Sequence, residues 1–360
     1  MENDVVIVTG ASGRIGTQVV KRLGEKYRIV GFELLKAIYA SRREELVPVD
    51  LSSDESVVQA FTHIKNFYGN KIASVIHLAA YYSFSQKHSP LYESITVKGT
   101  ERLLKALSDF EVEQFLFTST MLVHAPTEPG CPIQEDMPLI PTWDYPLSKV
   151  HTEKLIHDMR GDIPTAIFRI AGVYDDLCHS IPISNQIQRI YEKQLQAHLF
   201  PGNICHGASF VHMDDLVDAI ELAVDQRKTL PKELPLLIGE PTTMSYDEVQ
   251  KEISCLLYNR DFTTWCIPKI VAKIGSWIEC ALSFRHKPFI RPWMIDFADD
   301  HYELDISRAK EILGWTPRHS VEKTLPTMIE ALLKDPIKWY KINGLHIPRH
   351  LEKKLMHDRR

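Results

Sequence analysis

Tyr145 and Lys149 are the two residues of this chain whose types and spacing best fit acid–base chemistry. They stand four residues apart in the run Tyr-Pro-Leu-Ser-Lys, so a helix would place both side chains on one face. A phenol with its ordinary pKa of about 10 is a poor acid or base at neutral pH unless a neighbouring cation stabilises the phenolate. Lys149 can supply that cation, and Tyr145 could then move a proton to or from a substrate oxygen. The pair alone is a common chance pattern, so its meaning depends on the rest of the chain.

A glycine-rich turn near the N-terminus is the second feature that could do chemistry. The run Thr-Gly-Ala-Ser-Gly-Arg-Ile-Gly, residues 9–16, follows the apolar stretch Val5–Thr9 and opens an amphipathic segment. Glycines here allow a tight turn and let the backbone approach a pyrophosphate, whose charge the N-terminus of the following helix stabilises. Such turns also serve only to reverse the chain. The spacing predicts a dinucleotide site at Gly10, Ser12, Gly13, Arg14, Ile15 and Gly16.

A carboxylate at the end of the next apolar run indicates which dinucleotide would bind. Glu33 lies 23 residues after Gly10, where it could accept hydrogen bonds from the adenosine ribose hydroxyls. A carboxylate there also repels a 2′-phosphate, so the sequence favours NAD over NADP. Asp50 and Leu51 close a third apolar run and are expected to flank the adenine, unless Asp50 only forms a turn.

With a dinucleotide at the glycine turn, the tyrosine–lysine pair gains a definite chemistry. Tyr145 would take the proton of a substrate hydroxyl as hydride leaves its carbon, or return a proton to a carbonyl in the reverse direction. Lys149 and the positive nicotinamide ring would both lower the pKa of the phenol, and Lys149 could also bind the nicotinamide ribose. Tyr145 is therefore expected to contact cofactor and substrate, and Lys149 to contact the cofactor.

The elements that must position these residues alternate along the first half of the chain. Apolar runs rich in β-branched residues occur at Val5–Thr9, Arg28–Phe32, Leu46–Val49, Ala73–Leu78, Gln114–Ser119 and Thr165–Ile170. Helical patterns separate them at Ile15–Gly24, Asp54–Phe67, Leu91–Asp109 and Pro146–Arg160. Continuous apolar strands between helices predict a parallel sheet covered on both faces, which is a doubly wound Rossmann-type α/β fold.

The second half of the chain is less regular and mainly helical. We expect residues 1–175 to form the NAD-binding domain, with residues 209–240 returning to it. Residues 176–208 and 241–345 would form a smaller, mostly helical substrate-binding cap at the carboxyl ends of the strands, where α/β sheets bind ligands. Residues 346–360 would form a frayed tail.

Composition excludes several other classes of protein. The net charge of −5 offers no positive field for nucleic acid, and no run of about 20 apolar residues could span a membrane. A buried-strand pattern begins at Val5, so no signal peptide is indicated and a cytoplasmic location is expected. Six cysteines are scattered without Cys-x-x-Cys or zinc-type spacing, so we expect reduced thiols and no metal. The expected partner is a small-molecule substrate.

Further motifs follow the glycine turn and accompany the tyrosine–lysine pair. They are His77–Ala80, Gly99-Thr100, Phe117–Thr120, Arg169–Tyr174, Phe210–Asp215 and Leu313–Pro317. From Val5 to about Pro317 the chain thereby resembles an extended short-chain dehydrogenase/reductase of the NAD-dependent epimerase/dehydratase group. The resemblance implies that Leu78, Ala79 and Ala80 line the cofactor and that Thr120 hydrogen-bonds the reacting oxygen. It also implies that the two long helices, at residues 91–109 and 146–160, could form a homodimer interface.

Two neighbours bear on the predicted site. Ser119 precedes Thr120, and strand alternation would point the two hydroxyls to opposite faces, so only one can face the substrate. Tyr82 follows the fourth apolar run and is expected to line the substrate site near the nicotinamide.

The chain departs from the family pattern in ways that concern the substrate. Thr96 stands where members often have asparagine, and residues 206–209 lack the arginine that many nucleotide-sugar epimerases place there to bind a phosphate. The amphipathic segment Ile267–Glu279, followed by Trp293, resembles the cap of the 3β-hydroxysteroid dehydrogenase-like branch. This segment is either a hydrophobic lid over an apolar substrate or an ordinary core helix. Docking of the segment on a membrane surface is less favoured.

The sequence therefore predicts an NAD-dependent oxidoreductase or epimerase that acts on a secondary alcohol or ketone, with Tyr145 as the acid/base. Three alternatives stay open: a nucleotide-sugar epimerase that recycles its NAD, a 3β-hydroxysteroid dehydrogenase-like net dehydrogenase, and a non-catalytic nucleotide-binding scaffold. The last usually lacks the tyrosine or the lysine, and both are present here. Met121 and Leu122 follow Thr120 where a dehydratase would need acidic residues.

Overall fold

The structure is a computed structural model that describes residues 4–37, 46–83, 88–282, 291–348 and 351. Most of the predicted tail, residues 346–360, lies outside the described residues.

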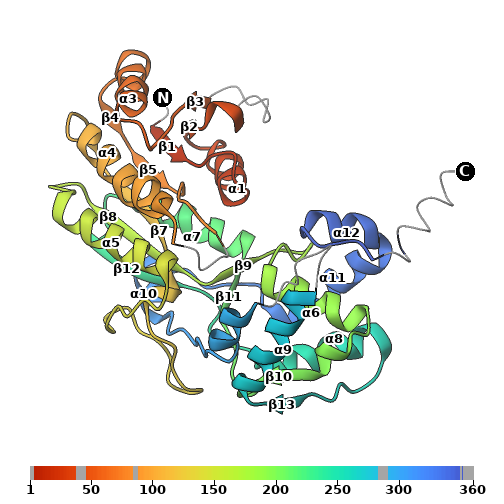
Figure 1. Cartoon of the computed structure of the whole chain (residues 1–360). Coiled ribbons are helices and arrows are strands. Elements are labelled where there is room, and N and C mark those ends of the chain that lie inside the picture. Colours follow the sequence, from red (N-terminus) through yellow and green to blue (C-terminus); the bar gives the residue numbers. More distant parts are fainter. Residues whose placement is uncertain (1–3, 38–45, 84–87, 283–290, 349–350, 352–360) are drawn as a thin grey trace, which may run out of the picture.

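A parallel sheet of seven strands forms the centre of the larger domain (Figure 1). In chain order its strands are β1 (Val5–Thr9), β2 (Arg28–Glu33), β3 (Leu46–Pro48), β5 (Ser74–His77), β7 (Phe115–Thr120), β8 (Thr165–Ile170) and β12 (Glu233–Ile238). Their spatial order is β12-β8-β7-β5-β1-β2-β3, and every neighbouring pair is parallel. The order reverses between β1 and β5, and a crevice for a ligand opens at the carboxyl ends of strands at such a point.

Helices cover both faces of this sheet. They are α1 (Arg14–Leu23), α3 (Asp54–Tyr68), α4 (Lys98–Leu107), α5 (Asp144–Met159) and α7 (Met213–Asp225). Alternate residues of β1 belong to two different cores: Val6 and Val8 pack with residues of α1 and α7, whereas Val5 and Ile7 pack with residues of α3, α4 and α5. This two-sided burial explains the continuous apolar runs in the sequence, and the predicted doubly wound fold is confirmed.

The remaining elements of the larger domain are short. A π-helix, η1 (Tyr92–Val97), leads into α4, and a 3-10 helix, η2 (Met121–Val123), follows β7. Two-residue strands β4 (Lys71–Ile72) and β6 (Glu111–Val112) pair with each other.

The cap is built mainly from helices, most of which share a third core. Its helices are α6 (Ile181–Tyr191), α8 (Tyr246–Tyr258), α9 (Lys269–Leu282), α11 (Val321–Lys334) and α12 (Pro336–Ile342), with 3-10 helices η3 (Leu195–His198) and η4 (Pro292–Phe297). Strands β10 (Leu199–Pro201) and β13 (Trp265–Ile267) pair with each other. Figure 1 shows these elements gathered at one end of the molecule, beyond the carboxyl ends of the large sheet. Helix α10 (Ser307–Leu313) instead packs against β12 and α7.

The segment after residue 208 divides between two sheets. Strand β11 (Phe210–His212) pairs with β9 (Gly172–Tyr174) in a separate two-stranded sheet, whereas β12 joins the large sheet beside β8. None of the described helices is long and apolar enough to cross a membrane. The apolar residues of α9 are exposed, so the interpretation of this segment as an ordinary core helix is wrong.

Candidate active site

The glycine turn has the geometry that a pyrophosphate requires. Gly10 has a φ of +70° and donates its N–H to the carbonyl of Phe32, at the end of β2. A Cβ on Gly16 would lie 2.2 Å from the carbonyl oxygen of Gly10, so only glycine fits there. No side chain caps the N-terminus of α1 at Gly13, and the buried Ser12 Oγ has no hydrogen-bond partner. Open helix N–H groups and an orphaned hydroxyl fit a bound dinucleotide phosphate.

Glu33 lies at the rim of this turn. Its carboxylate accepts one hydrogen bond from the Ser12 N–H and one from the Leu34 N–H, both at 2.9 Å. Arg14, at the start of α1, donates to the carbonyl of His179 in the loop that leads into the cap. The turn therefore has the Glu33 carboxylate where an adenosine ribose would lie, and the Arg14 guanidinium near the place that the phosphates of a dinucleotide would occupy.

Asp50 and Leu51 have structural partners of their own. Asp50 Oδ1 accepts hydrogen bonds from the backbone N–H and the hydroxyl of Ser52, which is the geometry of a local turn. Leu51 is buried, and its Cβ lies 3.0 Å from the Cβ position of Gly99 on the neighbouring helix. A role for either residue at the adenine stays a prediction.

The segment after β5 approaches the glycine turn closely. The N–H of Ala79 donates to the hydroxyl of Thr9 at 3.1 Å, and a Cβ on Gly10 would lie only 3.1 Å from the same nitrogen. Leu78 and Ala80 flank Ala79 and are partly buried. The predicted cofactor residues of β1 and β5 therefore meet where the strand order reverses.

His77 supports this junction as a neutral side chain. Thr100 donates its hydroxyl to a backbone carbonyl, so its oxygen accepts from His77 Nε2, and His77 Nδ1 in turn accepts from Thr9. Burial, together with the nearby Lys149, lowers the pKa of His77 to about 3. The histidine is therefore a structural hydrogen-bonding group.

Helix α5 holds Tyr145 and Lys149 at the carboxyl end of the sheet. Lys149 Nζ donates to the carbonyl of Thr118 at 2.7 Å and lies 5.9 Å from the centroid of the Tyr145 ring. Burial lowers the pKa of Lys149 to about 7, against a smaller opposing effect of Glu153. The ammonium is thus anchored beside the phenol, and its charge depends on what binds next to it.

Thr120 faces Tyr145, whereas Ser119 faces away from it. Burial raises the pKa of Tyr145, the neighbouring Tyr82 and Tyr92 raise it further, and a hydrogen bond with the Thr120 hydroxyl opposes them. Thr120 Oγ1 also accepts from the Leu122 N–H at 3.3 Å, which caps η2. Ser119 donates to Glu153 at 2.5 Å. The structure therefore brings Thr120, Tyr145 and Lys149 together and excludes Ser119 from the group.

A buried ion pair lies on the Ser119 side of β7. Arg169 on β8 binds Glu153 at 2.7 Å and also contacts His124 Nε2 at 3.2 Å. Burial and the charge of Arg169 lower the pKa of His124 to about 4, so this histidine is neutral in the fold. These contacts tie α5 to the strands beneath it and keep Tyr145 in place.

Aromatic rings enclose Tyr145. Its ring centroid lies 4.9 Å from that of Tyr82, 5.5 Å from that of Trp143 and 6.5 Å from that of Tyr92. Trp143 in turn lies 6.5 Å from Trp293, which η4 brings over from the cap. Tyr82 is half exposed and packs edge-on against Tyr145, and its role at the substrate stays a prediction. Sequence reasoning missed Tyr92 and Trp143, although the position of Trp143 two residues before Tyr145 was an available signal.

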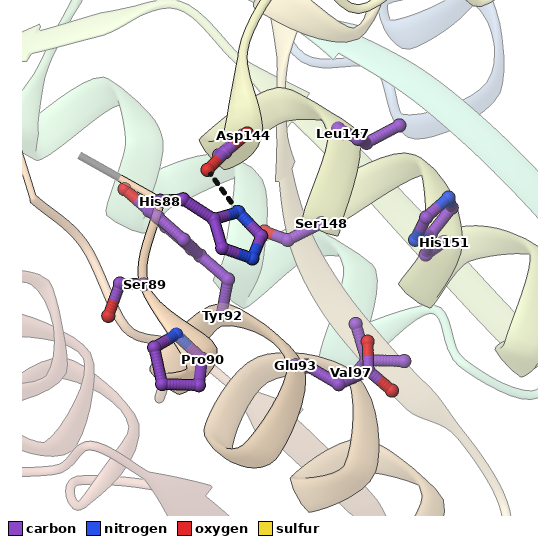
Figure 2. Close-up of a pocket in the computed structure, with 10 residues that line it drawn as sticks. All are labelled: His88, Ser89, Pro90, Tyr92, Glu93, Val97, Asp144, Leu147, Ser148 and His151. Atoms are coloured by element: carbon purple, nitrogen blue, oxygen red, sulfur yellow. Dashed lines mark hydrogen bonds and ion pairs between the residues drawn. The ribbon is translucent and has the colours of Figure 1, made fainter. Parts of the chain in front are cut away.

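A small pocket lies beside this enclosure, between η1 and α5 (Figure 2). His88 contacts Asp144 across its mouth at 3.0 Å, and Tyr92, Ser148 and Leu147 form part of its wall. The Tyr92 hydroxyl donates to the carbonyl of Ser83. Tyr92 therefore lines this pocket and also belongs to the aromatic enclosure of Tyr145.

Thr96, the departure from the family pattern, has a clear structural role. It is buried in η1, and its hydroxyl accepts a hydrogen bond from the Tyr81 N–H at 3.0 Å. This bond fixes the backbone immediately before Tyr82. Thr96 therefore shapes the wall of the site from beneath.

In the described ranges, one group of side chains is close enough together to suggest a metal: His212, Asp214 and His319. His212 Nδ1 already accepts the Asp214 N–H at the start of α7, which leaves the ring proton on Nε2. The two imidazoles are stacked, with centroids 4.0 Å apart and planes 20° apart, so their lone pairs do not converge. This geometry fits a helix cap better than a metal site.

Comparison with known proteins agrees with this geometry. Residues 6–239, more than half of the chain, match the NAD dependent epimerase/dehydratase family. A UDP-glucose 4-epimerase of Lactobacillus helveticus is 30% identical over 93% of this chain and 97% of its own length. A 3 beta-hydroxysteroid dehydrogenase type 7 of Mus musculus is 23% identical over 91% and 95%, respectively. The crystal structure of UDP-glucose 4-epimerase from Thermotoga maritima, with UDP-glucose, has the same fold, with a TM-score of 0.68 and 20% identity over 92% of this chain and 99% of that one.

The chain belongs to the NAD dependent epimerase/dehydratase family and is an NAD-dependent enzyme of the extended short-chain dehydrogenase/reductase type, an oxidoreductase or epimerase.

Proposed function

We propose that the enzyme catalyses the net NAD-dependent oxidation of a secondary alcohol on an apolar ring, or the reduction of the matching ketone. Tyr145 is the acid/base, Thr120 binds the reacting oxygen and Lys149 stabilises the phenolate. The observation that carries this proposal is the convergence of these three residues inside an aromatic enclosure at the cofactor crevice.

In the oxidation, Tyr145 as phenolate forms a new O–H bond while the O–H bond of the substrate breaks. The hydrogen on the substrate carbon leaves with its electron pair, and the alcohol becomes a ketone. Bound NAD supplies the hydride acceptor for this step. Thr120 keeps the reacting oxygen beside the phenol, and the Lys149 ammonium favours the phenolate against the burial and the neighbouring tyrosines that raise its pKa.

The surroundings of Tyr145 support an uncharged, apolar substrate. Tyr82, Trp143 and Trp293 offer ring faces rather than cations. The cap segment that carries Trp293 continues into two acidic residues, Asp299 and Asp300, which offer no positive charge to a diphosphate. Burial raises the pKa of Asp300 to about 6. Residues 206–209, His-Gly-Ala-Ser, offer no arginine for a diphosphate.

A nucleotide-sugar epimerase is the second candidate function. It is favoured by the UDP-glucose 4-epimerase relative that is similar over nearly its whole length. In that case the same three residues would remove hydride from the sugar and return it to the opposite face, with no net change in NAD.

One experiment separates the two functions. Purified enzyme with NAD is given cyclic apolar secondary alcohols, and separately UDP-glucose and UDP-glucuronate, while reduced-nicotinamide absorbance and sugar products are followed. A steady rise with an apolar alcohol supports the net dehydrogenase. Epimer formation without net reduction of NAD would contradict it and establish the second candidate.

We also propose that the enzyme is a homodimer through the outer face of α4 and α5. Leu147 on that face is 40% exposed and borders the pocket of Figure 2, which a partner side chain could fill. Sedimentation velocity should show a dimer for the native enzyme and a monomer for Leu147→Glu. A monomer at all concentrations would contradict this assembly.

A further inference from the structure

Helix α9 exposes its apolar side, which is unusual for a helix that packs against the body of its own protein. Its exposed residues include Ile270, Val271, Ile274, Trp277 and Ile278, which we call the α9 stripe. Their exposed fractions run from 46% at Ile278 to 73% at Ile270, and their spacing places them along one side of the helix. An amphipathic helix normally buries such a side against its own core.

The opposite side of α9 contacts the body of the cap through polar groups. Lys269 binds Asp299 and donates to the carbonyl of Asp296, and Lys273 pairs with Asp296 at 2.5 Å. Ser276, one turn further along the same side, is buried. The charged side of the helix therefore packs inward against η4 and the residues after it, and the apolar side points outward.

Exposed apolar side chains also occur on elements that lie near α9 in the fold. One residue, Pro268, separates strand β13 from α9, and Trp265 on this strand is 60% exposed. Leu199 on the paired strand β10 and Leu195 on the preceding η3 are exposed as well. Figure 1 shows α9, β10 and β13 together at the outer end of the cap.

The size and composition of the α9 stripe by itself favour a lipid bilayer over a protein. A helix of 14 residues is about 21 Å long, so one side about 10 Å wide presents about 200 Å². A stable protein interface needs about 800 Å² from each partner, several times that area. A single amphipathic helix is sufficient to lie in a membrane interface, and tryptophans such as Trp265 and Trp277 are typical of that depth.

We propose that the α9 stripe docks the enzyme on the surface of a lipid bilayer, with α9 lying in the plane of the interface. Because Lys269 and Lys273 are both paired with aspartates, they contribute little net charge to the surface. Docking is therefore driven by insertion of apolar side chains and depends only weakly on lipid charge and salt. This inference concerns a surface outside the catalytic group and does not require a particular substrate.

Co-flotation of the full-length enzyme with vesicles tests the inference directly. The enzyme should bind vesicles of phosphatidylcholine alone, bind no more than a few times better when phosphatidylserine is added, and remain bound in high salt. The double variant Ile274→Ser/Trp277→Ser should lower the partition coefficient at least tenfold. Phe67→Ser is the matched control, because Phe67 is 69% exposed on α3 while Trp277 is 67% exposed, and it should change nothing. Circular dichroism confirms that both variants are folded.

A second readout locates the contact. Vesicles with brominated acyl chains should quench the tryptophan fluorescence of the native enzyme, and Trp277→Phe should remove much of that quenching.

Three results would overturn the proposal. The first is the absence of flotation, or flotation that needs phosphatidylserine and disappears in salt. The second is loss of an oligomer in the double variant, which would make the α9 stripe a contact between copies. The third is a raised KM of the double variant for a soluble alcohol, with unchanged flotation. This result would show that the α9 stripe is a substrate lid. Because flotation is measured without turnover, its failure is distinct from failure of the proposed reaction.

Discussion

Thr120 and Ser119 are adjacent hydroxyls that the structure assigns to different tasks, and a pair of variants can separate them. Thr120→Val keeps the branched shape of the side chain and removes only the oxygen that faces Tyr145. Ser119→Ala removes the hydroxyl that donates to the buried Glu153. We expect the first variant to lose turnover and the second to lose stability.

The magnitudes follow from the contacts. Loss of one donor to a reacting oxygen typically lowers kcat by about 10²–10³, and Thr120→Val should fall in that range. Its cost in stability should be about 1–2 kcal/mol, since it loses the 3.3 Å bond from the Leu122 N–H and the hydrogen bond with Tyr145. Ser119→Ala removes a hydrogen bond to a charged, buried acceptor, which costs about 1.5–3 kcal/mol of the free energy of unfolding.

The assay combines two measurements on each variant. Urea unfolding gives the change in the free energy of unfolding, and reduced-nicotinamide absorbance gives kcat with the best alcohol from the substrate panel. Calorimetric titration with NAD should give an unchanged dissociation constant for both. If Thr120→Val keeps kcat within twofold, or folded Ser119→Ala loses it, the assignment of the two faces of β7 is refuted.

Other predictions address the cofactor, the acid/base and the buried histidine. Tyr145→Phe should lower kcat by about 10²–10⁴ and leave the NAD dissociation constant within twofold, and retained turnover would remove the phenol from the mechanism. Glu33→Ala should weaken NAD and relax the discrimination against NADP, measured as the ratio of the two dissociation constants, and an unchanged ratio would show that Glu33 does not touch the ribose. Gly16→Ala places a Cβ 2.2 Å from a carbonyl oxygen and should weaken NAD at least tenfold, whereas Gly275→Ala on α9 meets nothing within 4 Å and should leave NAD affinity unchanged. Since burial lowers the pKa of His77 to about 3, the unfolded chain binds a proton below pH of about 6.5 that the fold excludes. As the pH decreases, this group should therefore lower the free energy of unfolding by about 1.4 kcal/mol per pH unit. Urea titrations of His77→Gln should lack this contribution to the slope. An unchanged slope would show that His77 is charged in the fold.

Much of the site was predictable because its signals are local. A strand, a tight glycine turn and a helix occupy consecutive residues, so the motif at Gly10 to Gly16 specifies its own geometry. The four-residue spacing of Tyr145 and Lys149 needs only a helix, and the alternation of Ser119 and Thr120 needs only a strand. The continuous apolar runs predicted the parallel sheet because both faces of each strand are buried.

The sequence by itself determined the fold class, the family, the cofactor and the expected catalytic group, since each rests on short-range periodicity or on motifs in a fixed order. Only the tertiary structure decided what surrounds Tyr145, because Tyr92 reaches it from η1 and Trp293 reaches the neighbouring Trp143 from the cap, both far away in the chain. The orientation of α9 was likewise undetermined, since periodicity shows that a helix has an apolar side but not which side its neighbours bind. The orientation of α9 is set by the carbonyl and carboxylates near η4 that bind Lys269 and Lys273. Long-range partners of this kind leave no local pattern in the sequence.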